Sequence, residues 1–285
     1  MPIIVTSSAS LAGKNLLEQF VELYSFEKTG ESFENSPIYD YQGQDKLQLI
    51  TTRRKIIEAD HLNEFTTDLF IFTSKHESAA KIPALLTHST GNWTVEAKFG
   101  GHPHELGIAP AYAIKEAFLE LHNQKEQLNL EQYDVSLEVS HHGPTNLNAP
   151  IVFIEVGSTP DQWSDKVAVE AVVHSTMRVA CTKNRYQVVI GIGGGHYAPE
   201  FNQLLLKTEY AISHIVPRYV LDAIDEEMIR NAVERSVETI GYFALDWKGM
   251  KGHHREIIVQ ILNKLDLAYI KVRKLLRNRK KNIQL

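Results

Sequence analysis

Two short motifs place histidine beside glycine directly after apolar, strand-like runs of the chain. The first is Ser140-His141-His142-Gly143-Pro144-Thr145, which follows residues 135–139. The second is Gly193-Gly194-Gly195-His196-Tyr197, which follows residues 188–192. Histidine binds metals and moves protons near neutral pH, and glycine lets a ligand approach the backbone closely. Open α/β sheets build their sites in loops at the carboxyl ends of strands, so we expect the two motifs to form one active site.

The chain has 13 histidines, and this supply suggests metal chemistry. Catalytic zinc typically takes about three protein ligands and a water, and neutral imidazole is a usual ligand. His141 and His142 would point to opposite sides if the strand continued through them. We therefore expect one of the two to face the site, unless a turn at Gly143 relaxes the chain. Either Glu138 or Glu155 could orient an imidazole by accepting a hydrogen bond from the ring nitrogen that does not bind the metal.

The other histidines favour simpler interpretations. A single histidine beside a strand is commonly a hydrogen-bonded core residue, and we interpret His253 and His254 as exposed residues at the start of a helix. Four more have no site-like neighbours and are interpreted as structural or surface residues: His61, His122, His174 and His214.

The elements that must position these motifs alternate in type along the chain. Apolar runs and period-two patterns predict strands, and apolar residues three and four apart predict helices. Predicted strands cover residues 3–6, 47–51, 68–73, 135–140, 151–156, 187–192, 210–216, 242–245 and 267–272. Predicted helices lie near 16–21, from 111 to 121, from 160 to 180, from 225 to 237 with Asp225 as N-cap, and near 257–265.

This alternation predicts an α/β fold with a mixed central sheet and helices on both faces. We expect a single domain over residues 1–285, because no internal repeat or Pro/Gly/Ser-rich linker divides the chain. Residues 30–44 and 87–110 are interpreted as irregular elaborations of that domain.

Several common site motifs fail at specific positions. His196 stands where a dinucleotide-binding turn beginning at Gly191 needs its third glycine. Lys14 is followed by Asn15, so this segment is not a phosphate-binding loop. The chain has no G-x-S-x-G nucleophile elbow. These failures disfavour the commonest nucleotide-binding and esterase families.

Composition favours a cytoplasmic protein with one basic end. Cys181 is the only cysteine, which suits a reducing compartment. We read no secretory signal and no apolar stretch of about 18 residues that could span a membrane. The net charge is −5, yet residues 271–281 hold seven basic residues and no acidic one, so the rest carries −12. Such a basic tip could meet a polyanion or could be a solvated terminus.

Four motifs, in this order, resemble the D-aminoacyl-tRNA deacylase family of archaea and plants, and the resemblance extends over nearly the whole chain. They are Ser74-Lys75-His76-Glu77-Ser78, Leu86-Thr87-His88-Ser89-Thr90-Gly91-Asn92, Ser140-His141-His142-Gly143-Pro144-Thr145 and Gly193-Gly194-Gly195-His196-Tyr197-Ala198-Pro199. The resemblance implies a fold similar to peptidyl-tRNA hydrolase and purine nucleoside phosphorylase. It implies zinc dependence, and hydrolysis of the ester that joins a D-amino acid to the 3′-terminal adenosine of tRNA.

Motif context then suggests a role for each candidate residue. The candidate zinc (Zn2+) ligands are His88, His141 and His196, with His142 as an alternative to His141, and the candidate catalytic residues are His142, His196 and Thr145. The candidate substrate-binding residues are Lys75, His76, Gly193, Gly194, Gly195 and Tyr197. The candidate tRNA-binding residues are Lys271, Arg273, Lys274 and Arg277. We expect a monomer whose partner is its D-aminoacyl-tRNA substrate.

Three alternatives stay open at this point. One histidine, or the ribose 2′-hydroxyl, could assist the attack without a metal, while glycine amides stabilise the developing charge. A non-catalytic tRNA-binding protein would need only the basic tip. A nucleoside phosphorylase would need arginines at a phosphate site, and no recognisable motif surrounds Arg178, Arg185 or Arg218.

Overall fold

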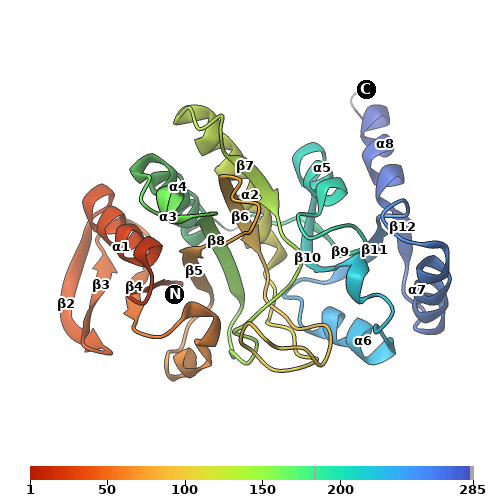
Figure 1. The fold of residues 1–285 in the computed structure, drawn as a ribbon, viewed down its shortest axis with the longest axis horizontal. Helices are drawn as coiled ribbons and strands as arrows, with labels where there is room; N and C mark the ends of the chain where they lie inside the picture. The colour runs from red at the N-terminus through yellow and green to blue at the C-terminus, as the bar shows by residue number, and fades with distance from the viewer. Residues whose placement is uncertain (183, 283–285) are drawn as a thin grey trace.

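Two β-sheets form this protein, shown here as a computed structural model (Figure 1). The structure describes residues 1–182 and 184–282, and for 278–282 it describes the backbone alone. The larger sheet contains β1 (Ile3–Ser7), β2 (Phe26–Phe33), β3 (Ser36–Tyr41), β4 (Gln48–Thr52), β5 (Phe70–Lys75), β6 (Ala84–His88), β7 (Asp134–Leu137) and β8 (Ile151–Gly157). The smaller sheet contains β9 (Gln187–Ile192), β10 (Tyr210–Val216), β11 (Ile240–Leu245) and β12 (Tyr269–Lys271).

The larger sheet is mixed, in the order β2-β3-β4-β1-β5-β8-β6-β7. Strand β1 runs parallel to β4 and β5, and β5 runs parallel to β8, whereas β6 runs antiparallel to β8. The smaller sheet is entirely parallel, in the order β10-β9-β11-β12. The predicted α/β fold with a mixed central sheet is confirmed.

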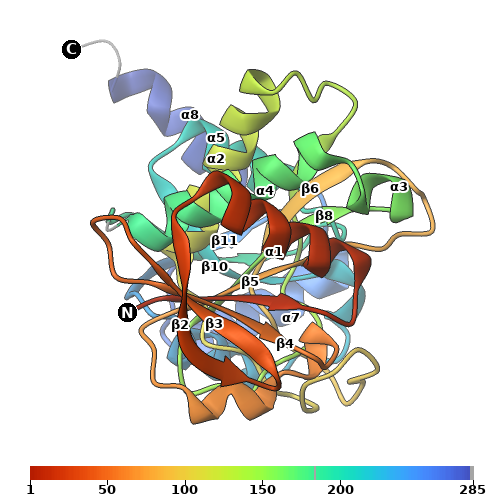
Figure 2. The same ribbon diagram turned by 90° about the vertical axis from the view of Figure 1, so that its left-hand side faces the viewer.

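Helices cover these sheets unequally. The helices are α1 (Leu11–Leu23), α2 (Ala111–Gln127), α3 (Pro160–Trp163), α4 (Lys166–Cys181), α5 (Pro199–Lys207), α6 (Glu226–Glu234), α7 (Gly252–Lys264) and α8 (Val272–Asn282), with 3-10 turns η1 (Ile56–Glu58), η2 (Asp60–Glu64) and η3 (Arg218–Val220). One face of the larger sheet packs against α1, α2 and α4, as Figure 2 shows for α1 and α4, and the other face is covered by η1, η2 and loops. The smaller sheet has α6 and α7 on one face and α5 and α8 on the other.

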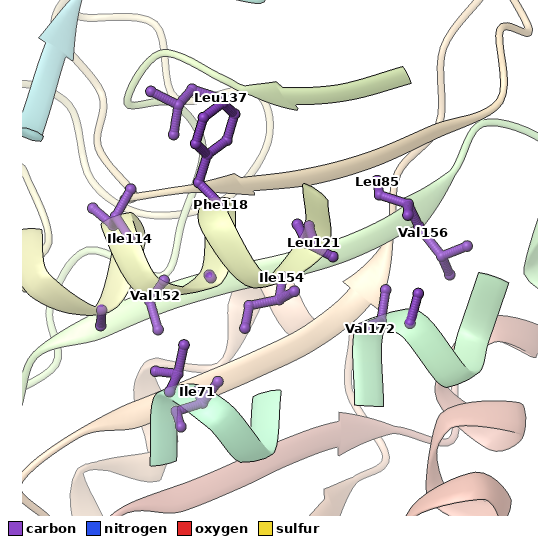
Figure 3. Close-up of a cluster of buried hydrophobic side chains, with 14 of the residues drawn as sticks. Ile71, Leu85, Ile114, Phe118, Leu121, Leu137, Val152, Ile154, Val156 and Val172 are labelled. Atoms are coloured by element: carbon purple, nitrogen blue, oxygen red, sulfur yellow. The ribbon is translucent and has the colours of Figure 1, made fainter. Parts of the chain in front are cut away.

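The core between α2 and the larger sheet shows how the sequence pattern dictates packing. Ile114, Phe118 and Leu121 recur at helical spacing and so share one face of α2. Figure 3 shows the Phe118 ring beside Leu137 of β7 and the Leu121 side chain near Ile154 of β8. Full burial of each such side chain contributes about 1.5–3 kcal/mol, so this face anchors α2 firmly.

The two sheets join where the predicted strand 135–140 ends early. Strand β7 ends at Leu137, and after the Glu138 N–H, which still donates to Thr87 of β6, the backbone N–H groups find acceptors in other segments. The Val139 N–H donates to the His196 carbonyl at 3.0 Å, and the Ser140 N–H donates to the Ile215 carbonyl at 3.2 Å. The first motif is thereby tied to the smaller sheet and to the second motif.

The prediction that residues 30–44 are irregular is wrong. This region forms most of the antiparallel pair β2 and β3. Glu34 and Asn35 connect the two strands and have φ values of 47° and 60°. Two consecutive positive φ values are typical of the tight turns that close β-hairpins.

The single long helix predicted from 160 to 180 is also wrong, because the structure has α3 and α4 there. The Asp165 side chain accepts the N–H groups of Val167 and Ala168, and this N-cap starts a new helix. Strand β6 and helices α5 and α8 were not predicted. Asp225 does cap α6, accepting the Met228 N–H, as expected.

In the part of the chain that the structure describes, no helix is long and apolar enough to cross a membrane. The organisation of residues 1–285 as a single domain stays a prediction.

A close approach between α1 and β1 gives a test of the fold. A Cβ at Gly13 would lie 2.0 Å from the Ser7 carbonyl oxygen. Gly13→Ala should therefore lower the free energy of unfolding, measured in urea, by about 1–3 kcal/mol. Gly252→Ala is the control, because a Cβ there meets nothing within 4 Å. Equal stability of the two variants would contradict this packing.

Candidate active site

Four imidazole rings from three segments meet at the junction of the two sheets. His88 ends β6, His141 and His142 follow β7, and His196 follows β9. The ring centroids of His88 and His141 lie 4.3 Å apart, and those of His141 and His196 lie 4.7 Å apart. The two glycine–histidine motifs therefore form one group, which we call the histidine cluster.

Both members of the consecutive pair face this cluster. His142 has a φ of 45°, and this left-handed conformation turns its ring back beside its neighbour. Its ring centroid lies 4.4 Å from that of His141 and 4.8 Å from that of His88. The expectation that one of the pair faces away would require a continuing strand, and β7 has already ended.

Backbone carbonyls set the orientation of three of these rings. The Nδ1 atoms of His88, His141 and His142 lie 3.0, 2.8 and 2.6 Å from the carbonyl oxygens of Ser89, Val139 and Gly143 respectively. A carbonyl oxygen only accepts hydrogen bonds, so each Nδ1 carries the proton. Each Nε2 is then left with a lone pair that can coordinate a metal.

Two carboxylates lie buried against the rings. Glu138 Oε1 is 2.9 Å from His196 Nε2 and 3.5 Å from His76 Nδ1. Glu155 Oε2 is 3.7 Å from His76 Nδ1 and 3.8 Å from His88 Nε2. Glu138 and Glu155 are each 97% or more withdrawn from solvent, with 2% and 3% exposure.

Three buried atoms in this group have no hydrogen-bond partner among the described residues. They are both carboxylate oxygens of Glu138 and the Nε2 of His88. The 2.9 Å contact from His196 is close, yet it is not aligned as a hydrogen bond. Unpaired buried polar atoms are costly, so their convergence indicates a site built for a ligand.

The electrostatics divide the histidines into two kinds. Burial, together with the neighbouring imidazoles, lowers the pKa of His141 well below its usual value and that of His142 to about 4. Burial alone would also lower the pKa values of His76 and His88, but the adjacent Glu155 and Glu138 raise them overall. His141 and His142 are therefore neutral at pH 7, which is the form that binds metals.

The carboxyl of Glu155 responds in the opposite way. Burial would raise its pKa, but the facing imidazoles of His76 and His88 hold it well below its usual range. Glu155 is thus an anion inside the protein.

The ligand atoms fall into overlapping groups within 4.8 Å of one another. One group is His88, His141 and His142, and a second is Glu138, His141 and His196. The predicted ligand set of His88, His141 and His196 does not occur as one group, because His142 rather than His196 completes the set around His88. A third group, His76, Glu138 and Glu155, adjoins them.

A buried polar tether, not foreseen from the sequence, holds two of the segments. His214 on β10 places its Nδ1 3.2 Å from Ser89 Oγ and 3.0 Å from Ser140 Oγ, and these two hydroxyls lie 2.7 Å apart. Ser89 follows His88 and Ser140 precedes His141, so His214 fixes the backbone on both sides of the cluster. The interpretation of His214 as a structural residue agrees with this, but no sequence pattern linked it to the site.

The predicted substrate-binding side chains lie at one side of the cluster. His76 Nε2 is 3.3 Å from the Tyr197 hydroxyl, which also lies 3.3 Å from Ser78 Oγ. Lys75 pairs with Glu77 at 2.5 Å and has its ammonium 4.6 Å from the centre of the Trp163 ring. Tyr197 is exposed, so it lies at the entrance rather than in the interior.

The glycine motif offers fewer free amides than expected. The Gly193 N–H donates to the Val216 carbonyl at 2.8 Å, so it is not available to a substrate. The N–H groups of Gly194 and Gly195 have no acceptor within the described residues. Tyr219, which the sequence did not suggest, places its hydroxyl 3.3 Å from His196 Nδ1.

Thr145 is occupied by structural contacts. Its hydroxyl donates to Glu105 at 2.7 Å and accepts the His102 N–H at 2.9 Å. These bonds tie the first motif to the 100–105 loop, and they leave the hydroxyl no proton to give a substrate.

His254 is buried at 3% exposure, so the expectation that both His253 and His254 are exposed is wrong for this residue. Both rings place Nε2 beside Asp222 Oδ1, at 3.1 and 2.9 Å. These contacts fix the start of α7 to the segment after η3.

The predicted tRNA-binding residues Lys271, Arg273, Lys274 and Arg277 lie at the end of β12 and on the first turns of α8. All four line a pocket beside Trp247.

Comparison with known proteins assigns the family. A profile of the D-aminoacyl-tRNA deacylase family matches residues 63–270. A D-aminoacyl-tRNA deacylase of Pyrococcus furiosus is 34% identical, with 95% of this chain and 100% of the relative aligned. One of Methanosarcina acetivorans is 37% identical, over 94% and 91%. A crystal structure described as a conserved protein of unknown function matches with a TM-score of 0.88 at 25% identity, over 97% of each chain. The chain belongs to the D-aminoacyl-tRNA deacylase family.

The buried tether gives a stability test. His214→Leu removes the ring nitrogen that joins Ser89 and Ser140, and it should cost about 1–3 kcal/mol of unfolding free energy. His122→Leu is the matched control, because His122 Nε2 is buried without a partner among the described residues. It should be neutral or stabilising. A His214→Leu variant as stable as the control would show that the hydrogen bonds of His214 do not stabilise the fold.

Proposed function

We propose that this chain hydrolyses the ester bond of D-aminoacyl-tRNA and releases the D-amino acid and free tRNA. Family membership supports this reaction, and the histidine cluster supports the position of the active site. The observation that carries the assignment is the buried Glu138 carboxylate, which has no aligned hydrogen bond and is surrounded by imidazoles at the meeting point of both motifs.

We further propose that the cluster holds zinc through the Nε2 atoms of His88, His141 and His142. The support is the chemistry of the donors: neutral imidazoles at His141 and His142, Nδ1 atoms fixed on carbonyls in all three rings, and ring nitrogens within 4.8 Å of each other. When bound, zinc supplies a Lewis acid that polarises a carbonyl and makes water more acidic. Glu155 Oε2 lies 3.8 Å from the same Nε2 atom of His88, so this buried anion would help to hold a cation there, while the Ser89 carbonyl orients the ring through Nδ1.

The remaining side chains divide the work around the ester. His196 is partly exposed and lies between Glu138 and Tyr219, so it is placed to take a proton from the attacking water. Glu138 would stabilise the imidazolium that results. The free N–H groups of Gly194 and Gly195 could donate to the developing oxyanion or to the terminal phosphate.

We assign substrate selection to the side of the cluster on which His76 and Tyr197 lie. His76 and Tyr197, joined at 3.3 Å, would contact the amino-acid portion near the entrance. Lys75 would contribute positive charge to the anionic RNA. We do not extend the catalytic role predicted for Thr145, because its hydroxyl is already committed.

The other predictions stand as parts of the same proposal. A protein that acts on aminoacyl-tRNA works where translation occurs, so we propose a cytoplasmic location, and we keep the monomer as the expected state. A phosphorylase or a non-catalytic binding protein would leave the buried carboxylate and imidazoles without a purpose.

The function is tested by stereochemical choice. D-tyrosyl-tRNA should be cleaved at least tenfold faster than L-tyrosyl-tRNA, measured by release of labelled tyrosine under single-turnover conditions. His196→Ala should slow D-tyrosine release by about 10²–10⁴-fold, the usual contribution of a general base. Equal cleavage of both esters, or of neither, would reject the proposal.

The zinc proposal has a separate test. Metal analysis of the purified protein should find zinc, and His141→Ala should lose it, because His141 belongs to both ligand groups around the cluster. His174→Ala is the control, since His174 lies on α4 with its Nδ1 2.7 Å from the Tyr24 hydroxyl at the end of α1 and belongs to none of the ligand groups. A chelated, metal-free protein with full activity would favour the metal-free route, with a histidine as the base.

A further inference from the structure

A second concave site lies beside the histidine cluster, at the carboxyl ends of β11 and β12. It has a volume of about 480 Å³, within the usual range of roughly 300–1,000 Å³ for ligand pockets. We call it the basic pocket, and its walls are Glu200, Leu245, Asp246, Trp247, Lys248, Lys271, Val272, Arg273, Lys274 and Arg277. Parallel α/β sheets bind ligands at this edge.

Cations dominate the basic pocket. Five basic side chains face two carboxylates, and one of the carboxylates, Glu200, is paired with Arg273 at 3.2 Å. Lys248, Lys274 and Arg277 have no carboxylate partner among the side chains that the structure describes. The N-terminus of α8 adds positive partial charge to this region. The first turn of α8 has no acidic residue that would offset that charge. An anion would relieve this accumulation of like charge.

An aromatic ring stands among these cations. The chain has three tryptophans; Trp93 and Trp163 are buried, whereas Trp247 is only half-buried. The Lys271 ammonium lies 3.9 Å from the centre of the Trp247 ring. Aromatic rings interleaved with Lys and Arg are typical of surfaces that bind single-stranded nucleic acid.

The basic pocket adjoins the chain segment that carries the second motif. The Asp246 N–H donates to the Ile192 carbonyl at 2.9 Å, and a Cβ on Gly194 would lie 3.2 Å from Asp246 Oδ2. Glu200 lies in the first turn of α5, four residues after His196. Helices α5 and α8 stand side by side here (Figure 1). Gly194 thus lies beside a wall of the pocket, two residues before His196 of the cluster.

We propose that the basic pocket binds the single RNA strand that leads to the esterified 3′ end. The ring of Trp247 would stack on a base, and the unpaired cations would neutralise phosphates. This proposal rests on the proposed function for its direction: the ester lies at the histidine cluster, and the nucleotides just 5′ of it lie in the pocket. The substrate-binding site would then include Trp247 and the cations around it, in addition to the residues proposed for catalysis.

The test measures binding of uncharged, 5′-labelled tRNA by fluorescence anisotropy. Lys274→Ala/Arg277→Ala should raise the Kd at least tenfold and should reduce the slope of log K against log salt by about two. Lys14→Ala/Lys28→Ala removes two exposed cations on α1 and β2, at the other end of the molecule from α8 (Figure 1), and is the matched control. Lys248→Ala and Trp247→Leu test two further walls of the pocket, and thermal melting shows that each variant is folded.

A trimmed tRNA without its single-stranded 3′ end separates strand binding from general attraction. Trimming should weaken binding to the unaltered protein and have little further effect on Lys274→Ala/Arg277→Ala. An equal cost of trimming in both proteins, or an equal loss of binding in the Lys14/Lys28 control, would overturn the proposal.

Hydrolysis of a D-tyrosyl ester of adenosine keeps this proposal distinct from the proposed function. That short substrate does not reach the basic pocket, so Lys274→Ala/Arg277→Ala should cleave it within twofold of the unaltered rate. If no protein cleaves it while tRNA binding behaves as expected, the proposed function fails and the RNA site stands. If all cleave it and tRNA binding is unaffected by the substitutions, the RNA site fails and the proposed function stands.

Discussion

The buried carboxylate of Glu138 is the constraint on which the rest of the site depends. Moving a charged carboxylate out of water costs several kcal/mol unless positive charge or hydrogen-bond donors compensate, and no donor is aligned on either oxygen of Glu138. The groups that surround it are imidazoles from the residue after β5, from β6 and from the two motif loops. A carboxylate in that setting is stabilised by protonated rings or by a cation. The fold therefore places a buried carboxylate at the position that we propose for ester hydrolysis.

The surroundings of Glu138 come from the junction of the two sheets and not from either sheet alone. The chain leaves β7 at Leu137, and its next residues bond to the segments of His196 and Ile215. Glu138 is therefore held at a seam, with the larger sheet on one side and the parallel smaller sheet on the other. His214 adds a second connection by bonding to the serines beside His88 and His141. The segments that carry the clustered histidines are thus fixed by contacts within the fold itself.

Sequence reasoning found the parts of this design that local patterns record. Buried strands, the Asp225 cap and the paired motifs followed from apolar runs, capping chemistry and glycine. The β2–β3 hairpin was missed because its exposed, charged residues lack a clear alternation, and its turn uses Glu34 and Asn35 without glycine. Long-range contacts left no local trace, so Tyr219 and the His214 tether could not be foreseen. The predicted ligand set stays a prediction. The structure adds His142 to the group around His88, and the left-handed φ that turns its ring inward cannot be read from residue types.

The most direct measurement is a crystal structure of the zinc-loaded protein with diffraction recorded at the zinc absorption edge. The account predicts an anomalous peak about 2.0–2.1 Å from the Nε2 atoms of His88, His141 and His142. A peak found elsewhere, for example between Asp222 and His254, with the histidine cluster unliganded, would contradict it.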